Sequence, residues 1–289
     1  MYRQPKILGK VEVPRVQTSH NFGGDSLEQA GYFPVSGAHL YTVLHRVADP
    51  IARVLLVGPF ASERHLSYIP WVRWARYLAA RRIECLRYDY RGIGESTGVF
   101  EEMSFENWIE DVELLAGWLK DRSPGVPLVL HGLELGAILA AKIFETSVGS
   151  ALLLWAPPGN ANQALRATLL RRISMDQAFK YGDERKPVSD YLRRLEDGHF
   201  LEVEGYRWSG RLWHDSFRFE LPSGLDDDGS AASASNRPVR IVKLDQRAAP
   251  LIKGSSIGWD TVEKDFSWLF ADNFEWIANS RAVSHEGNK

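Results

Sequence analysis

The stretch Pro127–Phe144, PLVLHGLELGAILAAKIF, decides the fold of this 289-residue chain. Its first five residues, PLVLH, are typical of a short strand that is buried in a sheet. Gly132 and Gly136 then bracket a sharp turn, and ELGAILAAKIF has the small side chains of a helix that packs closely on a sheet. The stretch therefore predicts a strand, a turn and a helix in direct succession.

Alternating strands and helices surround this stretch. The predicted strands are 32–35, 40–45, 52–60, 83–90, 127–131, 151–158 and 239–244, and the predicted helices are 67–80, 104–120, 134–144 and 266–279. A hairpin turn is expected at Ser36-Gly37, and Ser104 is expected to cap its helix, with Asn107 at the third helical position. Strands that alternate with helices favour a doubly wound, mostly parallel sheet with right-handed crossovers.

Residues 159–221 interrupt this alternation with two helical segments, ALRATLLRRI and VSDYLRRLED. They are interpreted as a helical cap that is inserted after the sixth strand. The predicted organisation is a polar leader at 1–30, a core at 31–158 and 237–281, the cap at 159–221, a flexible acidic linker at 222–236 and a tail at 282–289.

The composition is that of an ordinary globular protein, with 44% hydrophobic and 25% charged residues. A net charge of −2 predicts no nucleic-acid partner and no binding to an acidic membrane. The single cysteine, Cys85, excludes an internal disulfide and is expected in the core. No segment has the roughly 20 consecutive apolar residues of a membrane span, and residues 1–20 contain no apolar stretch of signal-peptide length. We therefore expect a cytoplasmic protein without a membrane span, in which a homodimer is allowed.

The turn of the central stretch, Gly132-Leu133-Glu134-Leu135-Gly136, has the pattern of a nucleophile elbow. In Gly-x-Ser-x-Gly, the middle residue has a strained backbone and projects its side chain over the C-terminal edge of the sheet. Glu134 holds this position here, and a glutamate cannot do what an activated serine does with a histidine base. The backbone N–H groups of Leu135 and Ala61 are the candidates for an oxyanion-like site.

The partners of a serine nucleophile are altered as well. The acid should follow the strand 239–244, where Asp245 is close but Arg247 falls nearer to the usual position. The histidine should precede the last helix, yet SSIGWDTVEKDFSWLF contains none, and His285 lies in the polar tail. Serine-hydrolase catalysis is therefore not supported, and both an enzyme and a non-enzyme hypothesis are kept.

A carboxylate at the elbow is costly if it is buried without a partner. Arg64, His65 and Arg91 are the candidate partners because their loops should converge on the elbow, and Phe60 is a further candidate for the wall of the cleft. Open water, or a bound cation or polar ligand, is the alternative. Asp-x-Arg-Gly-x-Gly-x-Ser follows at 89–96, where Asp89 and Arg91 are expected to order the loop by hydrogen bonds and an ion pair. A structural role is therefore favoured over a catalytic role for Ser96.

Motifs for metals and cofactors are missing from the sequence. No His, Cys, Asp or Glu cluster has metal-ligand spacing. Neither a phosphate-binding Gly-x-x-x-x-Gly-Lys loop nor a dinucleotide-binding fingerprint is present. No cofactor and no metal are therefore implied.

Residues 55–98 resemble the front half of bacterial α/β hydrolases of the serine aminopeptidase-like type. More specifically, LHGLELGAILAAKIF and the segments 151–172, 202–222 and 257–279 are similar to hydrolases found alongside exosortase and exopolysaccharide gene clusters. In that group the elbow often reads Gly-Leu-x-Leu-Gly with a non-serine residue in the middle. The resemblance implies an α/β-hydrolase fold over most of 32–280 and a role near exopolysaccharide production or protein sorting.

Three hypotheses about function follow. The first is a non-catalytic protein that binds a small molecule or a partner protein through the cleft beneath the cap, and it predicts Glu134 paired with Arg64 or Arg91. The rival is an active hydrolase or acyltransferase acting on ester, thioester or amide bonds, with Glu134 beside a base such as His65 or beside a held water. The third is a structural subunit whose Trp-rich cap packs on another protein, and it predicts an exposed apolar patch.

Overall fold

The computed structural model describes residues 19–21, 27–61, 63–122, 124–178, 182, 186–223, 225, 237–244 and 266–280. Its centre is an eight-stranded sheet in the order β1-β2-β3-β5-β4-β6-β7-β10. The strands are β1 (Ser19–Asn21), β2 (Leu27–Val35), β3 (Ala38–Arg46), β4 (Ala52–Val57), β5 (Ile83–Tyr88), β6 (Leu128–Leu133), β7 (Ala151–Trp155) and β10 (Val239–Val242). β1, β2, β3 and β5 pair antiparallel in that order, and all other pairs in the sheet are parallel. The predicted mostly parallel sheet is thus confirmed.

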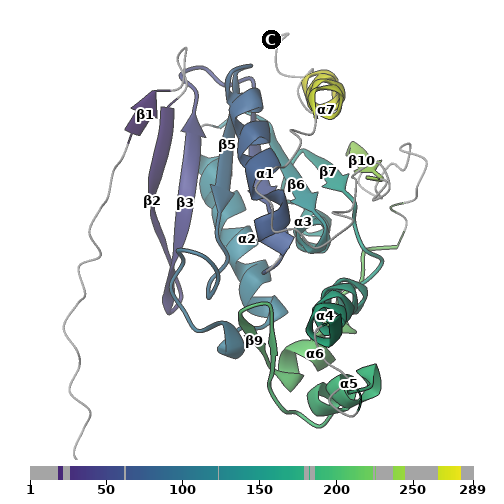
Figure 1. The fold of residues 1–289 in the computed structure, drawn as a ribbon. Helices are drawn as coiled ribbons and strands as arrows, with labels where there is room; N and C mark the ends of the chain where they lie inside the picture. The colour runs from purple at the N-terminus through teal and green to yellow at the C-terminus, as the bar shows by residue number, and fades with distance from the viewer. Residues whose placement is uncertain are drawn as a thin grey trace, which may run out of the picture.

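Helices cover both faces of this sheet (Figure 1). α1 (Glu63–Ala79) and α7 (Ser267–Asn279) pack on one face, and α2 (Phe105–Asp121) and α3 (Leu135–Glu145) pack on the other. The apolar residues that follow Arg53 in β4 face two different cores. Val54 and Leu56 belong to the core beneath α1, whereas Leu55 and Val57 belong to the core beneath α2 and α3.

A smaller unit between β7 and β10 lies at one end of the sheet (Figure 1). It contains α4 (Ala161–Ala178), α5 (Val188–Glu196), β8 (Leu201–Val203), β9 (Tyr206–Trp208) and α6 (Gly210–Ser216). The cap that was predicted as helical therefore also holds a two-stranded hairpin. Gly205, at φ 85°, supplies the left-handed backbone of its turn. The cap follows β7, which is the sixth strand when the count begins at β2.

The local predictions hold at several turns and ends. The hairpin between β2 and β3 turns at Ser36-Gly37, with Gly37 at φ 74°. Ser104 caps α2 in a reciprocal capping box: its hydroxyl accepts from the Asn107 N–H, and the Asn107 side chain accepts from the Ser104 N–H. Cys85 is fully buried, and burial raises the pKa of its thiol.

Two boundaries differ from the predictions. α1 begins at Glu63 and not at residue 67, because the Glu63 N–H already donates to the Phe60 carbonyl and starts the first turn. The predicted leader 1–30 includes β1 and the start of β2, where Leu27 pairs with Arg46 of β3. None of the helices in the described ranges is both long and apolar enough to cross a membrane. The tail 282–289 lies outside the described residues, as do Asp245 and Arg247.

Candidate functional site

The turn between β6 and α3 is a strained elbow at the C-terminal edge of the sheet. Glu134 has φ 52° and ψ −123°, a conformation that non-glycine residues rarely adopt. Its N–H donates to the Trp155 carbonyl at the end of β7 (2.9 Å), and its carbonyl accepts from the Ala137 N–H (2.9 Å). These two bonds fix the turn between strand and helix, so the Glu134 side chain is held at the edge of the sheet.

The two glycines of the elbow are required because the backbone of a neighbouring segment approaches each of them closely. A Cβ on Gly132 would lie 2.3 Å from the Cα of Ala137, and a Cβ on Gly136 would lie 2.2 Å from the Gly58 carbonyl oxygen. Both gaps are far shorter than any real Cβ contact, and both neighbours are backbone atoms that cannot swing away. Any side chain at either position would therefore push α3 away from β4 and β6.

The two backbone amides predicted for an oxyanion-like site are those of Leu135 and Ala61. Leu135 is the first residue of α3, and Ala61 follows β4 with φ 41°; both are buried. Neither amide donates a hydrogen bond to another described residue. The predicted oxyanion-side amides thus have no acceptor within the described part of the chain. The ring of Phe60 packs 4.9 Å from that of Trp108, in the core beneath α2.

The charged neighbours of Glu134 come from α1 and from the cap. Glu63, the first residue of α1, forms an ion pair with Arg171 of α4 (2.6 Å) and accepts a hydrogen bond from Thr168 Oγ1 (2.8 Å). Arg171 also pairs with Glu204 in the β8–β9 turn (2.9 Å). The pKa of the half-buried Glu134 is raised to about 7, mainly by burial and also by the nearby Glu63, while Arg171 opposes the change. Glu134 is therefore close to half protonated at neutral pH.

The three predicted partners of Glu134 are engaged elsewhere or exposed. Arg64 forms a two-pronged ion pair with Asp89, at 3.0 and 2.8 Å. Arg91 pairs with Asp111 and Glu110 of α2, and His65 is exposed on α1. These predictions were wrong because each arginine has a nearer carboxylate beside its own loop, and because α1 begins early enough to carry His65 to the surface.

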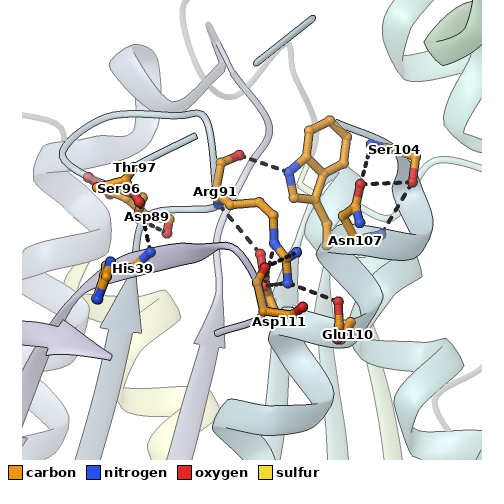
Figure 2. Close-up of polar contacts among 11 residues, drawn as sticks. His39, Asp89, Arg91, Ser96, Thr97, Ser104, Asn107, Glu110 and Asp111 are labelled. Atoms are coloured by element: carbon orange, nitrogen blue, oxygen red, sulfur yellow. Dashed lines mark hydrogen bonds and ion pairs between the residues drawn. The ribbon is translucent and has the colours of Figure 1, made fainter. Parts of the chain in front are cut away.

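The loop after β5 is ordered by a dense polar network (Figure 2). Asp89 accepts from the Glu95 N–H (3.0 Å) through its side chain and from Ser96 Oγ (2.5 Å) through its carbonyl. Trp108 Nε1 donates to the Arg91 carbonyl (3.1 Å). Asp89 and Arg91 order the loop as predicted, but they do not pair with each other. Asp89 pairs with Arg64, and Arg91 pairs with Asp111 and Glu110. Ser96 is fully used in this network, since its Oγ also accepts from the Tyr41 N–H.

No histidine in the described part of the chain makes a hydrogen bond to Glu134. His131 is close in sequence, but it is buried on the α1 face of β6, where its ring lies 4.6 Å from that of Trp155. Its Nδ1 lies 3.0 Å from the Leu153 carbonyl oxygen, and burial lowers its pKa to about 3. His131 is thus a neutral core residue. His285 lies outside the described residues.

The sequence analysis did not single out the charged neighbours of Glu134, Glu63 and Arg171, or the residues that hold them, Thr168 and Glu204. Three of them come from the cap, whose docking on the sheet depends on tertiary contacts and leaves no local pattern in ALRATLLRRI. Trp208 and Trp213 of the cap are each only 1% exposed. They therefore stabilise the inside of the cap and do not form an outer patch. Within the described ranges, no group of three His, Cys, Asp or Glu residues could hold a metal ion.

Comparisons with known proteins agree with this architecture. A family model described as serine aminopeptidase, S33, matches residues 68–183. The crystal structure of the α/β hydrolase GrgF from Penicillium sp. sh18 is 17% identical, with a TM-score of 0.53, and the match covers 88% of this chain and 99% of that one. Est1E from Butyrivibrio proteoclasticus, solved with ferulic acid bound, is 15% identical with a TM-score of 0.49, over 74% of this chain and 88% of that one. No curated protein matches the sequence significantly.

Proposed function

We propose that this chain, which has the α/β-hydrolase fold, is a non-catalytic binding protein that holds a polar small molecule or a segment of a partner protein between the elbow and the cap. One observation carries the proposal. At the position of the nucleophile, the charged neighbours of Glu134 are the Glu63 carboxylate and Arg171 of the cap, and none of the histidines in the described ranges contacts it.

This environment disfavours nucleophilic catalysis. An attacking carboxylate must be ionised, whereas the pKa of Glu134 is raised to about 7. A histidine normally activates the nucleophile or the water that follows, and the described histidines do not contact Glu134. A chain with neither an ionised nucleophile nor a histidine beside it in the described residues is expected to keep the scaffold of a hydrolase without catalysing hydrolysis.

The same surroundings suit a polar ligand. The Ala61 and Leu135 amides can donate to an oxygen atom of the ligand, and Glu134 can donate when protonated or accept when ionised. The resemblance to hydrolases of exosortase and exopolysaccharide gene clusters directs the search to ligands and partner proteins of such systems. A cytoplasmic location is part of this proposal.

A hydrolysis screen tests the proposal. The purified wild-type protein, Glu134→Ala and Glu134→Ser are assayed with panels of esters, thioesters and amides, and Glu95→Gln, on the exposed loop after β5, serves as the matched control. No turnover above background is expected in any of the four proteins, because Glu134→Ser restores a hydroxyl but no histidine base. Wild-type turnover that persists in Glu95→Gln and disappears in Glu134→Ala would overturn the proposal.

The second candidate is an active hydrolase or acyltransferase, and the pairing of two glutamates favours it. Glu134 retains a proton near neutral pH, while the Glu63 carboxylate is held by Arg171 and Thr168. Two carboxyl groups in different environments can divide the roles of general acid and general base. In this reading Glu134 protonates a leaving group and Glu63 activates water.

The same screen separates the two candidate functions when the variants Glu63→Gln and Glu134→Gln are added to it. The enzyme hypothesis predicts that Glu63→Gln and Glu134→Gln each lower the rate at least 100-fold, the usual size of a general acid or base contribution. It also predicts a bell-shaped pH profile in the wild type. A wild-type rate that neither substitution changes would exclude both glutamates from the reaction.

A further inference from the structure

A small open cleft lies between α1 and the C-terminal ends of β4 and β5, beside the elbow but not lined by Glu134. Its lining includes Arg64, Tyr68, Trp71 and Arg87, together with one acidic residue, Asp89. The walls are mostly aromatic, and the two arginines supply the positive charge. Because Glu134 does not line this cleft, the cleft is a site separate from the elbow.

Arg87 of β5 is held in one orientation by a chain of hydrogen bonds. Its Nε donates to Nε2 of His45 on β3 (3.2 Å), and His45 Nδ1 lies 3.4 Å from a carboxylate oxygen of Glu28 on β2. Burial, with a contribution from Arg87, lowers the pKa of His45 to about 4. The ring is therefore neutral at pH 7, accepts from Arg87 and directs its own N–H to Glu28. This arrangement leaves the terminal nitrogens of Arg87 available.

The nearby carboxylates are already engaged by other cations. Both oxygens of Asp89 accept from Arg64, and one of them also accepts from the Glu95 N–H. Glu28 accepts from Arg76 at 2.7 Å. Among the described residues, no carboxylate forms an ion pair with Arg87 within 4.0 Å. The lining thus carries one positive charge, on a half-buried guanidinium, that no acidic side chain pairs directly.

Tyr68 of α1 completes the wall between the two cations. Its ring centre lies 5.0 Å from Cζ of Arg64 and 5.8 Å from Cζ of Arg87. A guanidinium beside an aromatic wall pairs well with a carboxylate or phosphate, because it offers parallel N–H donors in a partly desolvated place. The cleft is small, so it suits one such group, with the rest of the ligand outside.

We propose that this cleft binds the carboxylate or phosphate group of an anionic ligand, with Arg87 as the ion-pairing residue and His45 as the residue that positions it. The proposal is independent of the function proposed for the elbow. Because Gly58 and Pro59 line the cleft and lead directly to Phe60 and Ala61, an anion bound here would also fix the oxyanion-side loop.

The test measures thermal stabilisation by inorganic phosphate and by acetate, each against sodium chloride at the same ionic strength. Phosphate, acetate or both are expected to raise the melting temperature of the wild type in a saturable way, since a ligand that binds only the folded state stabilises it. Which of the two acts identifies the group that the site prefers. A wild type that responds to neither anion beyond chloride would overturn the proposal.

Variants assign the effect to Arg87. Arg87→Gln is expected to weaken the apparent affinity at least 10-fold, and Arg87→Lys, which keeps the charge but loses the planar fork, at least 3-fold. Arg81→Gln is the matched control because Arg81 stacks on Tyr77, away from the cleft, and it should bind as the wild type does. If Arg87→Gln does not fold, Arg87→Lys decides. Unchanged affinity in the decisive variant would overturn the proposal.

Discussion

Glu134 gives the protein a specific dependence of stability on pH. Its pKa is about 7 in the folded state and about 4.5 when exposed, so the folded state holds the proton more tightly. The contribution of Glu134 to stability is therefore full below pH 4.5 and is lost as the pH rises to about 7. The full change amounts to up to about 3 kcal/mol. Chemical denaturation at pH 5 and pH 8 should show that Glu134→Gln becomes more stable relative to the wild type at the higher pH. An equal difference at both values would refute the raised pKa.

Gly136 is required for space and not for turn flexibility. Gly136→Ala should destabilise the protein by about 3 kcal/mol, because its Cβ would lie 2.2 Å from the Gly58 carbonyl oxygen. Gly117→Ala is the matched control: nothing lies within 4 Å of a Cβ there, and the residue sits inside α2. It should stabilise the protein by up to about 1 kcal/mol. Urea denaturation of both variants measures the difference, and similar values for the two would contradict the packing argument.

The elbow was predictable at the residue level, whereas its neighbours were not. Gly132 and Gly136 flank a non-serine residue in the sequence itself, and the order of strand and helix identifies the turn. Arg171 lies 37 positions later along the chain, and it reaches the elbow only because α4 docks over the sheet. The convergence of loops at the sheet edge predicts Arg64 and Arg91 near Glu134. Asp89 and Asp111 instead bind these two arginines, and this competition depends on side-chain geometry that the sequence does not show.

At the scale of the element, helix ends and turns could be predicted from the local sequence wherever a capping residue or a turn glycine is present. Ser104 and Asn107 form the capping box of α2. Gly37 allows the β2–β3 turn. The start of α1 at Glu63 does not follow from periodicity, because the residues of its first turn, Glu63 to His65, are polar and carry no apolar repeat. The β8–β9 hairpin was missed because two strands of three residues each are too short for periodicity to reveal.

The capping box of α2 should have a measurable effect on stability. Ser104→Ala removes the hydroxyl that accepts from the Asn107 N–H and is expected to cost about 1 kcal/mol. Ser104→Asp is the control, since aspartate is an equally good N-cap residue and should restore most of the loss. Thermal denaturation of the three proteins compares them. If Ser104→Asp is as unstable as Ser104→Ala, the side-chain cap is not the cause.

At the scale of the whole molecule, the cap contacts the core at several separate places. A neck forms where Gly159–Ala161 runs antiparallel to Phe219–Leu221, with N–H to carbonyl distances of 2.7 and 2.9 Å. On the other side, Arg171 bridges Glu63 of the core and Glu204 of the cap. Tyr206 of β9 also packs on Phe100 near the start of α2, with ring centres 4.9 Å apart. The pair of Arg171 with Glu63 is the contact that fastens α4 of the cap beside the elbow.

Arg171→Gln should therefore loosen the cap without unfolding the core. The substitution removes the ion pairs of Arg171 with Glu63 and with Glu204, but only the pair with Glu63 joins the cap to the core, and the expected loss of stability is about 1 kcal/mol. Hydrogen exchange should accelerate in α4 and in the β8–β9 hairpin, while β4 and β6 stay protected. The pKa of Glu134 should also rise, because Arg171 is the cation that lowers it. Arg193→Gln is the control, since Arg193 pairs with Asp190 within α5 and is largely exposed. Exchange in α4 that is equal in both variants would show that Arg171 does not fasten the cap.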